Sequence, residues 1–174
     1  MSKQFSDLGI QESIIKALDD LKIVVPTEIQ QKTISLLLTT QTDLVGLAKT
    51  GTGKTAAFGL PLLQLIDSKI TDVQAVILAP TRELGHQIFS NLEAFAKYIP
   101  EISIAETCGG IPIKPQIERL TSPTHIVVAT PGRLIDLIQR KAVSLKETQF
   151  LVLDEADEMV TILKEGLDEI IAEL

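Results

Sequence analysis

Residues 48–55 combine glycines, lysines and threonines at a spacing that can bind a phosphate group. The segment reads Ala-Lys-Thr-Gly-Thr-Gly-Lys-Thr and lies between an apolar run and a helical pattern. Gly51 and Gly53 allow the backbone N–H groups to face a di- or triphosphate, and a helix starting near Lys54 adds its positive end. Lys54 can reach the β- and γ-phosphates, and the Thr55 hydroxyl can ligate Mg²⁺. A ligand-free glycine turn is the alternative, but Gly-Lys-Thr at a strand-to-helix junction favours a nucleotide site.

Two carboxylates follow a second apolar run at 151–153. Asp154 and Glu155 begin the sequence Asp-Glu-Ala-Asp. Ligands of open α/β sheets bind at the carboxyl ends of the strands, where these side chains are expected. We predict that Asp154 holds Mg²⁺ directly or through water, and that Glu155 orients and deprotonates the attacking water. The alternative is a solvated acidic face, because the whole segment is acidic.

The elements that must position these residues are visible as apolar runs alternating with helical patterns. Continuously apolar runs are typical of strands buried on both faces of a parallel sheet. Between them, apolar residues recur at three- and four-residue spacing, which predicts helices. The chain is therefore predicted to be an α/β domain, a parallel sheet with helices on both faces. The predicted strands are 43–48, 75–79, 102–105, 125–129 and 150–153, and the predicted helices are 10–20, 27–39, 55–66, 83–98 and 132–140.

The charge distribution argues against nucleic-acid binding through a broad basic surface. The 174 residues include 16 basic and 23 acidic side chains, a net charge of −7. Residues 147–174 hold one basic and nine acidic residues, a net of −8, so residues 1–146 have 15 − 14 = +1. Aromatic residues make up 3% of the chain and Trp is absent, which excludes a base-stacking platform. Any bound nucleic acid must be held mostly by its backbone.

The hydropathy and the cysteine content of the sequence restrict the cellular compartments in which the protein is expected. The longest apolar runs are far shorter than the ~20 residues of a membrane span, and residues 1–30 carry no export signal. The only cysteine, Cys108, excludes an internal disulfide and a cysteine-based zinc site. We expect a cytoplasmic monomer with no membrane association.

Several motifs together resemble the DEAD-box ATP-dependent RNA helicases, specifically their N-terminal RecA-like lobe. The Asp-Glu-Ala-Asp sequence is the first match, and the phosphate loop is the second, because the family has alanine where Ala48 stands. The other matches follow the family's order: Pro-Thr-x-x-Gln at 26–30 with Phe5 upstream, Pro-Thr-Arg-Glu-Leu at 80–84, Gly-Gly at 109–110 and Thr-Pro-Gly-Arg at 130–133.

The resemblance implies one RecA-like P-loop domain over residues 1–174. Residues 1–42 would form an adenine-recognition extension and residues 43–174 a P-loop core that is truncated at its C-terminal side, without the family's second lobe. The implied activity is RNA-stimulated ATP hydrolysis, with Mg²⁺, coupled to local unwinding of an RNA duplex. This lobe would bind nucleotide yet turn over very little ATP, because the second lobe of the same protein supplies arginines that act on the γ-phosphate.

The site residues that the resemblance implies fall into three groups. Catalysis is assigned to Lys54, Asp154 and Glu155, with Thr55 and Asp154 directed to Mg²⁺. Nucleotide binding is assigned to Phe5, Pro26, Thr27, Gln30, Thr50, Gly51, Thr52, Gly53, Lys54 and Thr55. RNA binding is assigned to Thr81, Arg82, Gly110, Thr130, Gly132 and Arg133.

The chemistry of these side chains fits the implied ligands. The Gln30 amide can pair with N6 and N7 of adenine, and Phe5 can stack on the base. The alternative makes Phe5 an anchor of the first helix and Gln30 a surface residue. Helix N-termini beside Arg82 and Arg133 can bind backbone phosphates whatever the base sequence. Contacts to 2′-hydroxyl groups would favour RNA over DNA.

The sequence departs from the family pattern at three places, and three functions other than an RNA helicase are considered. Lys22 and Ile23 stand where the family has a Gly-aromatic pair, and we expect them to alter packing near the adenine site; Gly85 replaces an alanine, and the usual Gly-Phe after the acidic motif is absent. Cys108 is expected to fill a small space near the glycine pair. The alternatives are a non-catalytic nucleotide- or partner-binding module, a DNA-translocating ATPase and, least supported, a small-molecule kinase. The coding sequence beyond Leu174 separates the module from the helicase.

Overall fold

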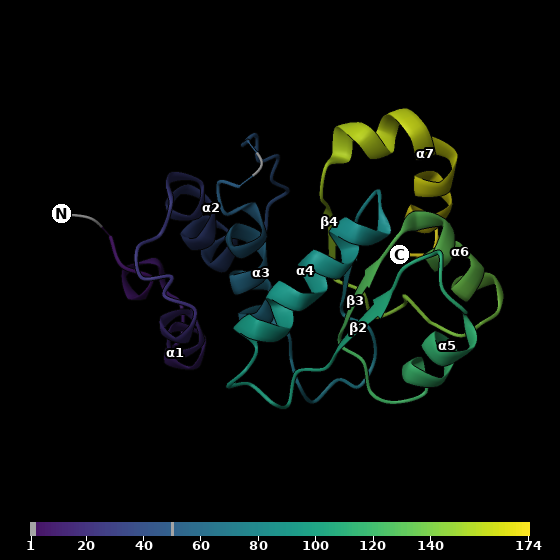
Figure 1. Cartoon of the computed structure of the whole chain (residues 1–174), viewed down its shortest axis with the longest axis horizontal. Coiled ribbons are helices and arrows are strands. Elements are labelled where there is room, and N and C mark those ends of the chain that lie inside the picture. Colours follow the sequence, from purple (N-terminus) through teal and green to yellow (C-terminus); the bar gives the residue numbers. More distant parts are fainter. Residues whose placement is uncertain (1–2, 50) are drawn as a thin grey trace. The chain divides into compact units, whose positions relative to one another are not determined.

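The computed structural model describes residues 3–49 and 51–174, with side chains throughout these ranges except at 162–165. The chain divides into two compact units, residues 1–65 with 91–100 and residues 66–90 with 101–174. The first unit contains η1 (Ser6–Leu8), α1 (Glu12–Asp20), α2 (Glu28–Thr39), α3 (Lys54–Leu65) and the end of α4 (Arg82–Phe95). The second contains the start of α4 with β1 (Ala75–Leu78), β2 (Ile104–Thr107), α5 (Lys114–Leu120), β3 (Ile126–Ala129), α6 (Pro131–Gln139), β4 (Phe150–Leu153) and α7 (Ala156–Ile171) (Figure 1).

The second unit is built on a four-stranded parallel sheet in the order β2-β3-β1-β4. The last residues of the four strands are paired with one another, so the strands end at the same height in the sheet. Leu78 pairs with both Ala129 and Leu153, and Thr107 pairs with Ala129. The loops that leave the four strands therefore start from one edge of the sheet, which is where ligands of such sheets bind.

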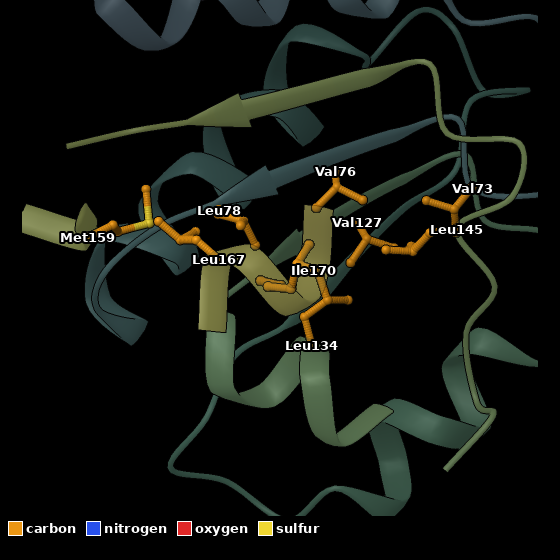
Figure 2. Close-up of a cluster of buried hydrophobic side chains, with 10 residues drawn as sticks. Val73, Val76, Leu78, Val127, Leu134, Leu145, Met159, Leu167 and Ile170 are labelled. Carbon is orange, nitrogen blue, oxygen red and sulfur yellow. The ribbon is translucent and has the colours of Figure 1, made fainter. Parts of the chain in front are cut away.

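Helices cover both faces of this sheet. On one face, Val76, Leu78 and Val127 pack with Leu134 of α6 and Ile170 of α7 in a buried apolar cluster (Figure 2). On the other face the start of α4 lies against the sheet. A Cβ at Gly85 would lie 3.9 Å from the Cβ of Ala79, and His86 Nδ1 lies 2.9 Å from a carboxylate oxygen of Glu106 in β2. The predicted α/β architecture is confirmed.

The first unit is helical among its described residues. Its core is formed by fully buried side chains of α1, α2 and α3, including Ile14, Ile34 and Leu60. Gln64 of α3 fastens the start of α1, because it accepts a hydrogen bond from Gln11 N (2.8 Å) and donates one to Gly9 O (2.9 Å). Within the described parts of both units, every helix falls short of the length and apolarity that crossing a bilayer requires.

Several elements differ from the sequence-based predictions, and the strand predicted over 102–105 lies two residues later, as β2. The strand predicted over 43–48 is wrong, since residues 41–49 are neither helix nor strand and Val45 and Leu47 are 85% and 91% exposed. An apolar run becomes a strand only when it finds a partner edge, and Gly46 in its middle weakens that tendency. The α5 helix was not predicted, because its seven residues are too few for a periodic signal.

Lys22 adopts a backbone conformation that favours glycine, with φ 60°. It ends α1, where its N–H donates to Asp19 O and Ile23 N–H donates to Leu18 O, both at 2.9 Å. A left-handed residue at this position costs a side chain about 1–2 kcal/mol, partly offset by the flexibility of an unfolded glycine. Lys22→Gly is therefore expected to raise the free energy of unfolding by about 1 kcal/mol, measured by urea denaturation. Lys22→Ala is the control, and equal stability of the two variants would contradict the argument.

Candidate nucleotide and RNA sites

The phosphate loop leads directly into the N-terminus of α3. Gly51 and Gly53 have φ values of 77° and 89°, which side chains adopt only with strain. The first helical hydrogen bond runs from Ala57 N to Gly53 O (3.0 Å). In general, the N–H groups of a helix's first turn point out of its N-terminus and are available to an anion. Lys54 and Thr55, both half-buried, occupy the first turn, where an anion is stabilised by the helix dipole. Thr50, a predicted member of this loop, lies outside the described residues.

Gln30 connects the start of α2 to the phosphate loop. Its side chain is 3% exposed, its Oε1 accepts from Thr27 N (2.9 Å), and its Nε2 donates to Gly53 O (3.1 Å). Gln30 is therefore no surface residue, and it lies beside the backbone expected to bind phosphate. An amide has two donors and an oxygen that accepts twice, so one donor and one acceptor position remain for a base edge. Pro26 also lies here, with its carbonyl accepting from Gln31 Nε2 (2.8 Å).

Phe5 lies in the core of the first unit. It is 3% exposed, caps η1, and lines an open pocket of about 170 Å³ that also borders α1 and the segment after it. The residues lining this pocket are Gln4, Phe5, Ser6, Ile15, Leu18, Asp19, Ile23 and Val24. Burial of Phe5 favours the anchoring role, and stacking on adenine stays a prediction.

Asp154 and Glu155 lie at the carboxyl end of β4. Asp154 N donates to Leu78 O (3.0 Å), which extends the sheet ladder by one residue, and Asp154 is 8% exposed. Glu155 follows in the left-handed region, φ 51° and ψ 51°, with its N–H 3.2 Å from Asp154 Oδ1. A glutamate held in this region costs about 1–2 kcal/mol, and such outliers are found where a side chain must be aimed.

The donor chemistry of the predicted metal ligands suits Mg²⁺. The Thr55 hydroxyl and the Asp154 carboxylate are hard oxygen donors, and Mg²⁺ binds one or two protein oxygens while keeping waters and phosphate oxygens. Thr55 lies in the first unit and Asp154 in the second. In the described part of the chain, no three side chains form a site of their own for a metal ion.

The segments predicted to contact RNA leave three adjacent strands and contact one another. Gly109 N donates to Thr130 Oγ1 (3.0 Å), which joins the loop after β2 to the loop after β3. A Cβ at Gly110, whose φ is 80°, would lie 3.6 Å from Cδ of Arg82 at the start of α4. Arg133 Nη2 donates to Ile111 O (2.8 Å). Helices α4 and α6 thus begin at the same edge of the sheet, beside two arginines and two glycines.

The other predicted RNA residues lie in the same place. Thr81 is exposed and its Oγ1 accepts from Leu84 N (3.3 Å), which caps α4. Gly132 is exposed in the first turn of α6, with open space around the position of a Cβ. Gln116 belongs to this network as well, and sequence reasoning missed it because a lone glutamine in a short helix carries no signal.

The chain was compared with protein-family models and with known proteins. Residues 27–174 match the model of the DEAD/DEAH box helicase family. The chain belongs to this family. It is 45% identical to the ATP-dependent RNA helicase CshA of Listeria monocytogenes, over 93% of this chain and 32% of that protein. It is 43% identical to the ATP-dependent RNA helicase DeaD of Haemophilus influenzae, over 98% of this chain and 28% of that protein.

Solved structures of the family have the same fold. The crystal structure of a DEAD box protein from Methanococcus jannaschii superposes with a TM-score of 0.91 at 36% identity, over 99% of this chain and 47% of that one. The chain therefore spans about a third of the curated relatives and about half of this solved DEAD-box chain.

Cys108 explains one departure of this DEAD-box chain from the family pattern. A Cβ at Gly85 would lie 2.5 Å from Cys108 Sγ, so the sulfur fills the space where an alanine methyl would point. Cys108 is fully buried, and this burial raises its pKa to about 11, with the nearby Glu106 carboxylate acting in the same direction. The thiol is thus protonated at neutral pH and serves as packing, as the sequence analysis predicted.

Proposed function

We propose that this chain is the ATP-binding lobe of an ATP-dependent RNA helicase. The observation that carries the proposal is the phosphate loop, two left-handed glycines that lead into the N-terminus of α3 and are held by the buried Gln30. Family membership and the printed names of the relatives support ATP as the nucleotide and RNA as the polymer.

In this proposal the first unit binds and orients the nucleotide. N–H groups of the loop and of the first turn of α3 donate to the phosphates, and Lys54 neutralises the β- and γ-phosphate charge. Mg²⁺, when bound to oxygens of Thr55 and Asp154, supplies further neutralisation of that charge. Gln30 presents its remaining donor and acceptor to adenine, whereas guanine has an oxygen in place of the amine and would leave a partner unpaired.

Glu155 is proposed to accept the proton of the attacking water. It lies between β4 and α7 with a left-handed backbone, and its N–H contacts Asp154 Oδ1. General-base action contributes about 10²–10⁴-fold in rate. The remaining stabilisation would come from arginines of a second RecA-like lobe, which are worth about 10³–10⁵-fold.

The polymer partner is proposed to be RNA, bound through its backbone at the edge formed by α4, α6 and the glycine loop. The two helix N-termini and Arg82 and Arg133 provide donors and charge there without a basic surface. Such contacts are insensitive to base sequence. We further propose that the protein acts as a monomer in the cytoplasm, in keeping with a single buried thiol.

Nucleotide binding by this chain tests the proposal. We expect Mg-ATP to bind more tightly than Mg-GTP, and Lys54→Ala to weaken ATP binding by about 10–100-fold, because a hydrogen bond to a charged group is lost. Lys49→Ala is a matched control, since it removes an exposed lysine of the same segment and should change affinity less than about fivefold. Fluorescence titration measures each dissociation constant. Equal losses in both variants, or no ATP binding by the unaltered chain, would overturn the assignment.

A further inference from the structure

Gln116 in α5 lies at the centre of the hydrogen-bond network behind the predicted RNA site. It is 5% exposed, and both ends of its amide are used. Nε2 donates to Cys108 O (3.0 Å), at the residue that precedes the glycine pair, and Oε1 accepts from Arg133 Nη1 (2.6 Å).

Arg133 is consequently tied to both sides of the glycine loop. Nη1 reaches Cys108 through Gln116, and Nη2 donates to Ile111 O (2.8 Å) directly. Both acceptors are neutral, and the described residues place no carboxylate within ion-pair distance of this guanidinium. Its positive charge is therefore fixed in position without being cancelled, and three of its five N–H donors remain for a ligand.

We infer that Gln116 is a positioning residue for RNA binding, which holds Arg133 and the Gly109–Gly110 loop in one fixed arrangement. The inference rests on the proposed function. An amide can make both contacts, because it donates at one end and accepts at the other. A glutamate could accept from Arg133 but could not donate to Cys108 O, and its charge would neutralise the arginine. A methionine fills a similar volume and makes neither hydrogen bond.

The test measures binding of a fluorescein-labelled single-stranded oligouridylate to this chain by anisotropy, over a series of salt concentrations. Gln116→Met is expected to weaken RNA binding about tenfold with an unchanged salt slope, because the charge of Arg133 stays but is no longer held. Gln116→Glu is expected to weaken binding and also to lower the salt slope by about one. Gln139→Met, on the exposed end of α6, is the matched control and should bind like the unaltered chain.

Two further measurements separate positioning from a general structural role. In an Arg133→Ala background, Gln116→Met should cause less than a twofold further loss of RNA affinity, because its effect acts through Arg133. The dissociation constant for Mg-ATP should stay unchanged in every Gln116 variant. Unweakened RNA binding by Gln116→Met, or full additivity with Arg133→Ala, would overturn the inference alone. Failure of the unaltered chain to bind RNA would overturn both it and the proposed RNA function.

Discussion

Glu155→Gln is expected to slow RNA-stimulated ATP hydrolysis by about 10²–10⁴-fold while leaving the affinity for Mg-ATP nearly unchanged. Glutamine has the same size and can adopt the same backbone, but its amide cannot take a proton from water. Single-turnover hydrolysis should be measured with a protein that joins this chain to the proposed second lobe, at saturating RNA. A parallel titration with nucleotide separates the loss of chemistry from a loss of binding.

The control for this substitution is Glu158→Gln. Glu158 is an exposed acid in the first turn of the same helix, so the change in net charge is identical. We expect hydrolysis by this variant within about twofold of the unaltered protein, since surface charges have small effects. A Glu155→Gln variant that keeps a third or more of the rate would remove Glu155 from the role of base.

The backbone of Glu155 offers an independent readout of the same assignment. Glu155→Gly relieves the left-handed strain, so it should raise the free energy of unfolding of this chain by about 1 kcal/mol. Hydrolysis should nevertheless be lost, as in Glu155→Gln. A residue that weakens the fold and supports the reaction matches the trade-off between stability and activity found at functional sites.

The strands of the sheet could be predicted because four continuously apolar runs in the sequence indicate buried strands. Strand β4 has the predicted bounds, and β1 and β3 differ by one residue at one end. Such runs are typical of strands buried on both faces of a parallel sheet. The run at 43–48 has the same apolar character yet forms no strand, because pairing is decided by residues far along the chain.

The sequence names candidate site residues one by one, but it does not show the contacts between them. The bond from Gln30 to Gly53 spans 23 positions, and the one from Arg133 to Gln116 spans 17. Contacts of this kind have no periodicity, so a single sequence does not reveal them. The same holds for Gly85, whose lack of a side chain makes sense only once the sulfur of Cys108 is seen beside it.

Lys22 departs from the family pattern, and one consequence of this departure is visible only in the structure. Its replacement of a glycine was expected to alter packing near the adenine site. The direct consequence in the structure is a left-handed backbone at the end of α1, whereas Ile23 is the residue that lines the pocket beside Phe5. Backbone strain depends on φ, which the residue type alone does not specify.

Gly53→Ala should be the most damaging small substitution in the phosphate loop, with Gly51→Ala as its matched partner. Both glycines have a positive φ, so either alanine costs about 1–2 kcal/mol of backbone strain. At Gly51 the new methyl group meets no atom within 4 Å, whereas at Gly53 it would overlap Nε2 of Gln30. Moving the buried Gln30 amide breaks its bonds to Thr27 N and Gly53 O, which adds about 1–3 kcal/mol.

Urea denaturation of this chain should therefore show a loss of about 1–2 kcal/mol for Gly51→Ala and about 2–5 kcal/mol for Gly53→Ala. A double-mutant cycle identifies the cause. In a Gln30→Ala background the overlap is gone, so Gly53→Ala should cost no more than Gly51→Ala does. If Gly53→Ala costs the same with and without Gln30, the amide does not hold the loop, and the coupling of base recognition to phosphate binding has to be placed elsewhere.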